Sequence, residues 1–255
     1  REQTYTEEPF MAAAAERFPL RRHSFELDQT AFMRALEPAQ KAYDEPYANP
    51  SVQAAYYCFL LAQQAGKTCL LAGDGGDEIF GGNERYLKDR ILGMYGSIPR
   101  MIRAAWEQPL ERLPLHGHIP NRLRKMVRRA QMPNPDRFYA DMAFASAHWA
   151  NLPGPAFRDH PLPIDASAEH VRGLYRTCGA DDELHRLLYL DMKLAIADND
   201  LRKVVGCGSI FGIEPRFPLL DLNLVEFVNG LSSAAKLRHG QKRYLFKKAL
   251  KGYLP

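Results

Sequence analysis

The first quarter of the chain alternates between stretches with helical and with extended patterns of apolar positions. Residues 5–17 place two glutamates before an alanine-rich stretch, which is typical of a helix. The segment Leu20–Leu27 is predicted to be a strand, and Asp28 then caps a second helix. Turn-forming residues before Val52 introduce a third predicted helix, over residues 51–65.

A short, continuous apolar run at Thr68–Ala72 lies between a lysine and a glycine, as is typical of a buried parallel strand. Strands and helices therefore alternate up to residue 82, which predicts an α/β layer. After residue 83 the apolar spacing becomes helical. We predict an α/β part over residues 1–82, with a partial parallel sheet and flanking helices, and a mainly helical lobe over residues 83–255.

The composition narrows the class of protein. The 255 residues are 46% hydrophobic and 25% charged, as in globular domains, which disfavours disorder, collagen-like repeats and coiled coils. The longest apolar run, Ala54–Ala62, is far shorter than the roughly 20 residues of a bilayer span, so no membrane segment is predicted. The 34 basic and 30 acidic residues give a net charge of +4, too small to indicate nucleic-acid binding. Four widely spaced cysteines are typical of a reducing compartment, so we expect a cytoplasmic protein.

The segment Gly73–Gly82 carries the most distinctive chemistry, because it places three carboxylates and five glycines directly after the predicted buried strand. In open α/β sheets ligands bind beyond the carboxyl ends of the strands, where glycines let the backbone approach a phosphate. Since Mg²⁺ is held by one or two carboxylates together with phosphate oxygens, Asp74 and Asp77 are candidate magnesium or substrate-amine contacts. The alternative is a solvated turn in which Asp77 and Glu78 only favour the positive end of the next helix.

Several segments together resemble a known signature. The matching segments are, in chain order, Asp44-Glu45-Pro46, Gly73–Gly82 with Arg85-Tyr86, Lys203-Val204, Glu214–Asp221 and Lys242–Pro255. Their order and spacing resemble the synthetase domain of the asparagine synthase family. The resemblance covers essentially the whole chain.

The resemblance implies an adenine-nucleotide α-hydrolase-like fold and a carbon–nitrogen ligase of amino-acid biosynthesis. In that family ATP, with Mg²⁺, activates the aspartate side-chain carboxylate as an acyl-adenylate. Ammonia released from glutamine by a glutaminase domain then displaces AMP. The implied partners are therefore small molecules, namely aspartate or another carboxylate, and ammonia, and a homodimer remains open.

The resemblance also assigns roles within the acidic loop. Asp77 would hold magnesium and pyrophosphate, with Asp74 or Glu78 as further candidate metal contacts. Asp74 would also lie beside the reacting acyl group, as a catalytic residue. The ATP and pyrophosphate would additionally contact three loop glycines, which are Gly73, Gly75 and Gly76.

Further candidates come from the second half of the chain. The resemblance implies a catalytic role for Lys203, whereas the structural interpretation is a cation near unpaired carbonyls at a helix end. Glu214 and Arg216 either act on substrate or form an ion pair that shapes their loop. Asp221 belongs to the same loop, or caps a helix that begins near Leu222.

The chain also departs from the family pattern. The pyrophosphate loop, a Ser-Gly-Gly-x-Asp-Ser motif at the end of a first strand, does not occur in these residues, nor does a counterpart of the glutaminase domain. We therefore expect a fragment, or a chain completed by a partner, whose sheet lacks one strand and which alone is inactive. Gly206 stands where most members have a basic residue, which leaves that role vacant unless Arg202 or Lys203 fills it.

These departures keep two alternatives open besides an asparagine-forming ligase. One is a related amide-forming cyclase or amidotransferase of specialised metabolism, with a different acyl acceptor. The other is a catalytically inactive scaffold that retains the helical lobe.

Overall fold

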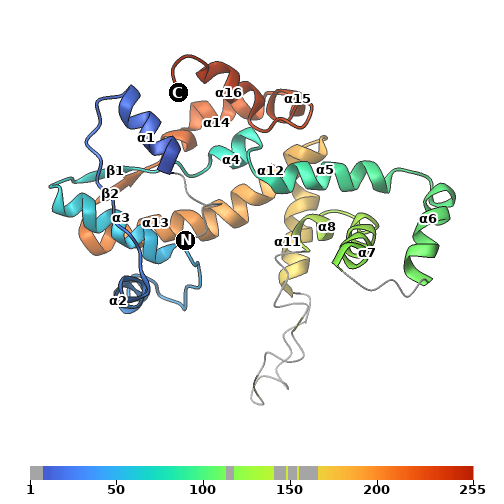
Figure 1. The fold of residues 1–255 in the computed structure, drawn as a ribbon, viewed down its shortest axis with the longest axis horizontal. Coiled ribbons are helices and arrows are strands. Elements are labelled where there is room, and N and C mark those ends of the chain that lie inside the picture. Colours follow the sequence, from blue (N-terminus) through green and yellow to red (C-terminus); the bar gives the residue numbers. More distant parts are fainter. Residues whose placement is uncertain (1–7, 113–117, 141–147, 149–153, 155–165, 255) are drawn as a thin grey trace. The chain divides into compact units, whose positions relative to one another are not determined.

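The computed structural model describes residues 8–112, 118–140, 148, 154 and 166–254. The chain forms two compact units (Figure 1). Unit 1 comprises Arg1–Phe80 and Met192–Pro255, and unit 2 comprises Gly81–Asp191. Unit 1 is therefore discontinuous in the sequence, because the chain returns to it at Met192. Most described residues are helical, and a small parallel sheet makes the fold compatible with the α/β class.

The helices expected at the start of unit 1 are present as α1 (Glu8–Arg17), α2 (Gln29–Gln40) and α3 (Val52–Gln64). Asp28 caps α2 as predicted, because its Oδ1 accepts a hydrogen bond from the Ala31 backbone at 2.7 Å. Beyond α3 the chain turns at Gly66, whose φ of +67° lies in the left-handed region that favours glycine.

The predicted strand at Leu20–Leu27 is wrong. This segment has no regular secondary structure and pairs with no strand in the part of the chain that the structure describes. Leu20 and Phe25 are 60% and 46% exposed, although the Phe25 ring stacks on Tyr57 with centroids 4.1 Å apart. Apolar residues in a short segment do not by themselves make a strand, because the backbone needs a neighbouring strand for its hydrogen bonds.

The strand predicted at Thr68–Ala72 is present as β1 (Cys69–Leu71), but its predicted burial is wrong, because Cys69 and Leu70 are only partly buried and Leu71 is 68% exposed. Its partner is β2 (Glu214–Arg216), which runs parallel and sets Cys69 opposite Glu214. The core beneath this sheet comes mainly from α3 and from α13 (Leu201–Phe211). Its buried residues are Ala39, Val52, Phe59, Val204, Cys207 and Ile213.

The remaining elements of unit 1 lie around the two ends of α13. The π-helix η3 (Met192–Asp200) precedes α13, and β2 is followed by a 3₁₀ turn, η4 (Pro218–Leu220). The short helix α4 (Gly76–Phe80) packs on α14 (Leu222–Asn229) through buried side chains that include Phe80 and Val228. The chain closes with α15 (Ser233–Lys236) and α16 (Tyr244–Leu250).

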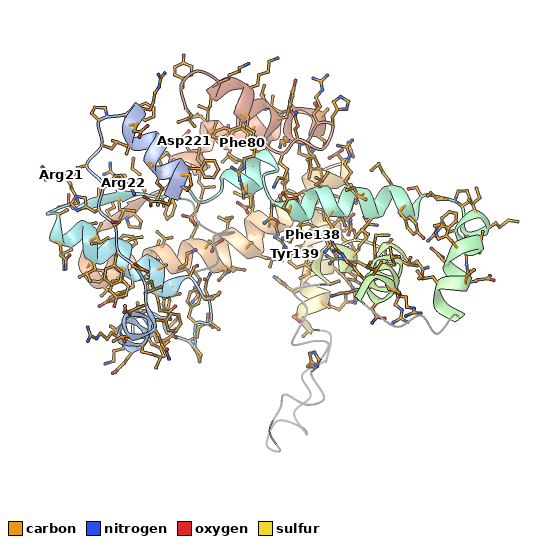
Figure 2. The ribbon with its side chains drawn as sticks, in the orientation of Figure 1. Arg21, Arg22, Phe80, Phe138, Tyr139 and Asp221 are labelled. Atoms are coloured by element: carbon orange, nitrogen blue, oxygen red, sulfur yellow. The ribbon has the colours of Figure 1, made fainter. Side chains whose placement is uncertain are left out.

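Unit 2 is helical throughout its described residues. Its elements are α5 (Glu84–Gly96), α6 (Arg100–Arg112), α7 (His118–Ala130), α8 (Asp136–Tyr139), α11 (Ala166–Thr177) and α12 (Glu183–Asp191). The fully buried carboxylate of Asp191 accepts hydrogen bonds from Tyr86 at 2.6 Å and from Arg85 and Tyr139 at 2.9 Å each. Tyr139 comes from α8, beside Phe138, which is labelled with it in Figure 2.

No helix among the described residues is long and apolar enough to cross a membrane.

Candidate active site

The acidic glycine loop leads from the carboxyl end of β1 into α4. Because β1 and β2 are parallel, the segment that follows β2 leaves from the same edge of the sheet. The two segments touch. A Cβ atom on Gly75, whose φ is +87°, would lie 2.1 Å from the Leu220 Cδ2 atom, and one on Gly76 would lie 2.8 Å from the Leu219 Cδ1 atom. A side chain at either position would displace the end of a leucine side chain in η4, and at Gly75 the positive φ would add backbone strain.

The pKa of Asp74 is influenced by charged groups near the start of α13. The side chain is partly buried, and burial raises the pKa of its carboxyl group, the Lys203 ammonium lowers that pKa, and Asp200 raises it. Lys203 Nζ also donates a hydrogen bond to Asp200 Oδ1 at 2.8 Å. Asp74 is therefore under the electrostatic influence of Lys203, the other residue predicted as catalytic, and of Asp200, which was not predicted and which forms the ion pair with Lys203.

Asp77 is bound by a cation from the closing segment of the chain. Its Oδ1 atom lies 2.8 Å from Nε of Arg243, and both side chains are about two-fifths exposed. Arg243 has a φ of +53°, which is uncommon for a residue other than glycine, and it directly precedes α16. Sequence analysis recognised the segment Lys242–Pro255 but not this residue. The available signal was two consecutive cations, Lys242 and Arg243, shortly after Gly240, whose φ is +78°.

Glu78 points elsewhere. It is buried in α4 together with Ile79 and Phe80, whereas Asp77 in the same first turn is partly exposed. Both carboxylates lie in that first turn, which is the position that the solvated-turn interpretation requires. Of the two, only Asp77 is accessible to a ligand.

Arg202 does not replace the basic residue that most family members have at position 206. Its guanidinium binds Glu45 at 2.7 Å and Asp44 at 3.2 Å, in an exposed pair that ties the Asp44-Glu45-Pro46 segment to α13. Lys203, one residue later, is the cation that acts on Asp74.

The other loop candidates have clear structural partners. Arg216 donates two hydrogen bonds of 3.1 Å to Glu214 along the exposed face of β2, and this pairing lowers the pKa of the Glu214 carboxyl. Asp221, labelled in Figure 2, caps α14 by accepting hydrogen bonds from Asn223 at 3.0 Å and Leu224 at 3.3 Å. The ion-pair and helix-cap interpretations therefore describe these residues, and a contact with substrate stays a prediction.

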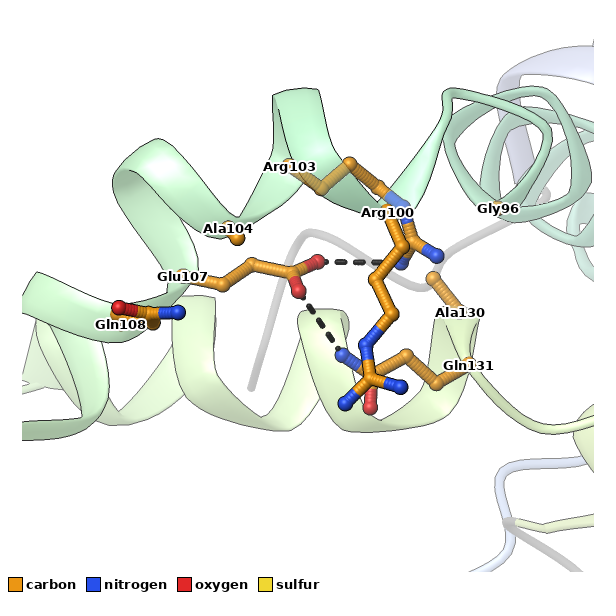
Figure 3. Close-up of a pocket in the computed structure, with 8 residues that line it drawn as sticks. All are labelled: Gly96, Arg100, Arg103, Ala104, Glu107, Gln108, Ala130 and Gln131. Atoms are coloured by element: carbon orange, nitrogen blue, oxygen red, sulfur yellow. Dashed lines mark hydrogen bonds and ion pairs between the residues drawn. The ribbon is translucent and has the colours of Figure 1, made fainter.

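A separate cavity of about 510 Å³ lies within unit 2. Figure 3 shows its floor, where Glu107 accepts hydrogen bonds from Arg103 and Gln131 at 3.1 Å each. No residue predicted for the active site lines it.

The model of the family described as asparagine synthase matches residues 1–255. The chain belongs to the asparagine synthase family. A Bacillus subtilis (strain 168) relative of this family, named "Asparagine synthetase (glutamine-hydrolyzing) 1", is 23% identical over 231 residues, which cover 88% of this chain and 34% of the relative. A Mycobacterium tuberculosis (strain H37Rv) relative, named "Putative asparagine synthetase (glutamine-hydrolyzing)", is 23% identical over 255 residues, 98% of this chain and 37% of the relative.

An archaeal relative, from Methanocaldococcus jannaschii, is 27% identical over 139 residues, which cover 54% of this chain and 26% of that protein. The chain thus spans between about a quarter and little more than a third of the length of these curated relatives. No solved structure matches it significantly. Its family membership supports an asparagine synthetase-like carbon–nitrogen ligase as the general class.

Proposed function

We propose that this chain is part of an ATP-dependent, amide-forming ligase that activates a carboxylate, aspartate in the first instance, as an acyl-adenylate and passes it to ammonia. The observation that supports the proposal is that the charges of Lys203 and Asp200 act on Asp74 in the loop after the carboxyl end of β1, where Gly75 and Gly76 lie against η4. This edge of a parallel sheet is where α/β folds bind nucleotides.

The glycine loop is the proposed contact for the phosphates of ATP. At Gly73 a Cβ would meet nothing within 4 Å, so the backbone there is open to a ligand, whereas Gly75 and Gly76 are closed on one side by η4. Arg243 adds a positive charge next to the loop through its pair with Asp77. An anionic leaving group such as pyrophosphate is stabilised by fixed cations and backbone donors of this kind.

The donors present fit a magnesium ion that is shared with phosphate. The described residues contain no group of three or more metal-ligating side chains, so a dedicated protein cage is not available there. Mg²⁺ commonly uses only one or two carboxylates beside phosphate oxygens, and the partly exposed Asp77 supplies one. When bound, the ion would neutralise charge on the departing pyrophosphate. Asp74 is the second candidate ligand, and the buried Glu78 fits least well.

Asp74 and Lys203 are the proposed catalytic pair. The cation beside Asp74 suits a site where an anionic carboxylate approaches a phosphate, because it offsets repulsion between the two. Burial keeps the pKa of Asp74 above its ordinary value, so this carboxyl holds a proton to higher pH than an exposed aspartate does. The proposed role of Asp74 is to face the acyl group and the incoming ammonia.

Two further features belong to the proposal. The ammonia comes from glutamine through a glutaminase domain outside these residues, and the pyrophosphate-gripping loop is likewise supplied by another segment or by a partner. The setting we propose is the cytoplasm.

The test is pyrophosphate release by the natural-length protein with ATP, Mg²⁺, ammonia and aspartate, followed by detection of asparagine. Lys203→Met should lower kcat strongly, while Lys41→Met, which removes a lysine from an exposed pair with Glu37 on α2, should not. Pyrophosphate release with another carboxylate but not with aspartate would indicate the cyclase or amidotransferase alternative. No release with any of a panel of carboxylates would refute the ligase and favour the scaffold.

The 255-residue chain by itself should not form the adenylate. The remaining carboxylates repel ATP that no pyrophosphate loop holds in place. The measurement is pyrophosphate release by the isolated chain with ATP, Mg²⁺ and aspartate. Turnover well above a control without protein would show that these residues contain the complete site.

A further inference from the structure

We propose that the cavity of unit 2 binds a small anionic molecule through Arg100, and that this molecule carries a carboxylate or phosphate group. The residues that line the cavity all belong to unit 2. None of these described residues has a role in the proposed ligase function, so the two proposals are independent of each other. The test of this second site needs no turnover.

The walls of the cavity come from three helices of unit 2. A Cβ atom on Gly96, the last residue of α5, would lie 2.9 Å from the carbonyl oxygen of Ala130, the last residue of α7. These two helix ends therefore approach each other backbone to backbone, which fixes this part of the wall. One face of α6 supplies the largest share of the lining, at the three- and four-residue spacing of a helix, through Arg100, Arg103, Ala104, Glu107 and Gln108.

The face of α6 that lines the cavity is charged, whereas the face turned away from it is apolar. Arg103 and Glu107 are buried, but Ile102 and Trp106 are 55% and 42% exposed. A helix of a globular protein normally turns its apolar face inward, because a buried charge is costly unless it is paired and hydrogen-bonded. Packing alone therefore does not explain why α6 directs charged side chains toward the cavity.

Glu107 and Arg103 form a neutral floor in this cavity (Figure 3). Glu107 accepts a hydrogen bond from Arg103 at 3.1 Å, and it also accepts hydrogen bonds from the Tyr95 hydroxyl at 2.8 Å and the Gln131 amide at 3.1 Å. Nε of Arg103 donates to the carbonyl of Ile98 at 2.9 Å. Because partners from several segments hold both charges, the floor is in place before a ligand binds and has no net charge.

Arg100 adds one positive charge to this neutral floor. In the part of the chain that the structure describes, its guanidinium makes no hydrogen bond or ion pair, and its side chain extends toward Gln131 (Figure 3). The lining thus contains two arginines and one glutamate, which is a net charge of +1. A guanidinium presents paired N–H donors that match a carboxylate or a phosphate, and this defines the class of ligand.

Two glutamines provide neutral polar contacts in the same cavity. Gln108 and Gln131 both line it, and Gln131 donates its amide nitrogen to Glu107, which leaves its amide oxygen as an acceptor. Hydroxyl or amino groups of a ligand therefore find partners near its anionic group. The volume of about 510 Å³ lies within the range of roughly 300–1,000 Å³ for pockets that hold small molecules. We expect a small, polar carboxylate or phosphate compound.

The first experiment adds citrate or inorganic phosphate to the natural-length protein, with sodium chloride at equal ionic strength as the reference. Calorimetry measures the affinity, and hydrogen–deuterium exchange locates the bound anion. Saturable binding of either anion that slows exchange at the start of α6 supports the site, and the two probes show which anionic group is preferred. If neither anion slows exchange in α6 beyond the sodium chloride reference, the proposal is overturned, even where exchange slows in the acidic glycine loop of unit 1.

The second experiment replaces the cation. Arg100→Gln should weaken binding by about 10-fold or more, because hydrogen bonds between charged groups are the strong ones. Arg100→Lys keeps the charge without the paired donors and should lie in between. The matched control is Arg122→Gln, which removes an exposed arginine of α7 that does not line the cavity and should change the affinity less than 2-fold. Equal weakening in Arg100→Gln and Arg122→Gln would show attraction to a basic surface only, and would refute the site.

The third experiment changes the affinity in the opposite direction. Glu107→Gln keeps the size of the side chain and removes its negative charge, so the Arg103 guanidinium is left to attract the ligand. The anion should bind several-fold more tightly than in wild type. Unchanged or weaker binding at an unchanged melting temperature would show that the anion does not lie in this cavity. Because Arg100 is exposed and has no partner among the described residues, its variants should keep the wild-type melting temperature and decide the proposal even where Glu107→Gln destabilises the fold.

Discussion

The two units each use a buried or partly buried aspartate, and the surroundings of these carboxylates differ. In unit 2, Asp191 is completely buried and receives three short hydrogen bonds, one of them from Arg85. In unit 1, Asp74 is only partly buried, and its pKa is lowered by the Lys203 cation and raised by the Asp200 carboxylate and by burial. The charge of Asp191 is offset by its three hydrogen bonds, whereas the pKa of Asp74 is raised by some neighbours and lowered by another.

The difference separates a structural carboxylate, Asp191, from the carboxylate that we propose to be catalytic, Asp74. A buried carboxylate whose oxygens already accept hydrogen bonds and an ion pair cannot also bind a ligand. Its hydrogen bonds instead connect the elements that donate them. For Asp191 these elements are α5 and α8. The pKa of Asp74 is raised by burial and Asp200 and lowered by Lys203, so it changes when any of these neighbours changes. Perturbed pKa values of this kind cluster at functional sites.

The largest expected effect is the loss of stability when Asp191 is replaced. Asp191→Ala should lower the free energy of unfolding by about 3–5 kcal/mol, because it leaves the Arg85 guanidinium and two tyrosine hydroxyls without their shared acceptor. Urea denaturation followed by circular dichroism measures this loss. Glu169→Ala, which removes an exposed carboxylate paired with Arg172 in the same unit, is the control and should cost about 1 kcal/mol or less. Equal losses in the two variants would contradict the contrast between the carboxylates.

The next effect is on rate. Asp77→Asn in the natural-length protein should lower kcat by about 10²-fold or more, by analogy with the removal of one electrostatic contact to a developing charge. The nucleotide affinity and the melting temperature should change little, since Asp77 is partly exposed and its pair with Arg243 is half in solvent. Glu37→Gln, a carboxylate lost from an exposed helical pair, serves as the control. If Asp77→Asn melts lower but turns over at the wild-type rate, Asp77 only favours the start of α4.

The smallest effect concerns the pH dependence of stability at Asp74. Because folding raises the pKa of Asp74, its contribution to stability is fully present below the ordinary aspartate pKa of 3.8 and is lost as the pH rises through the pKa in the folded chain. Asp74→Asn, which stays neutral, should therefore melt slightly higher than wild type at pH 7 and no higher below pH 3.8. Melting curves across this range measure the difference. A gain that persists at low pH would show that ionisation of Asp74 is not its cause.

Local signals in the sequence were sufficient for much of unit 1. The Asp28 cap, the helix closed by Gly66 and the apolar strand at β1 are all determined within a few residues, and each was predicted. The strand prediction at Leu20–Leu27 failed because the residues of a short segment do not show whether a neighbouring strand is present to pair with it. Its intended partner β1 pairs instead with β2, more than a hundred residues away.

The same reasoning explains which site residues were missed. Asp74 and Asp77 were found because their loop is distinctive by itself, and Lys203 because its segment resembles the family. Asp200 and Arg243 have no local mark, because their importance comes from contacts between distant segments. Arg100 is a further example, since its place at the cavity of unit 2 depends on the ends of α5 and α7.

The pairing of β1 with β2 also constrains the order in which the chain can fold. During synthesis β1 emerges early, but its partner strand is completed only after the whole of unit 2, Gly81–Asp191, has been made. Closing such a long loop is entropically costly and slow, whereas the contacts of a helical unit are mainly local and form quickly. Unit 2 is therefore expected to fold first, and β1 with its acidic loop must wait, with one edge unpaired, until residues 214–216 leave the ribosome.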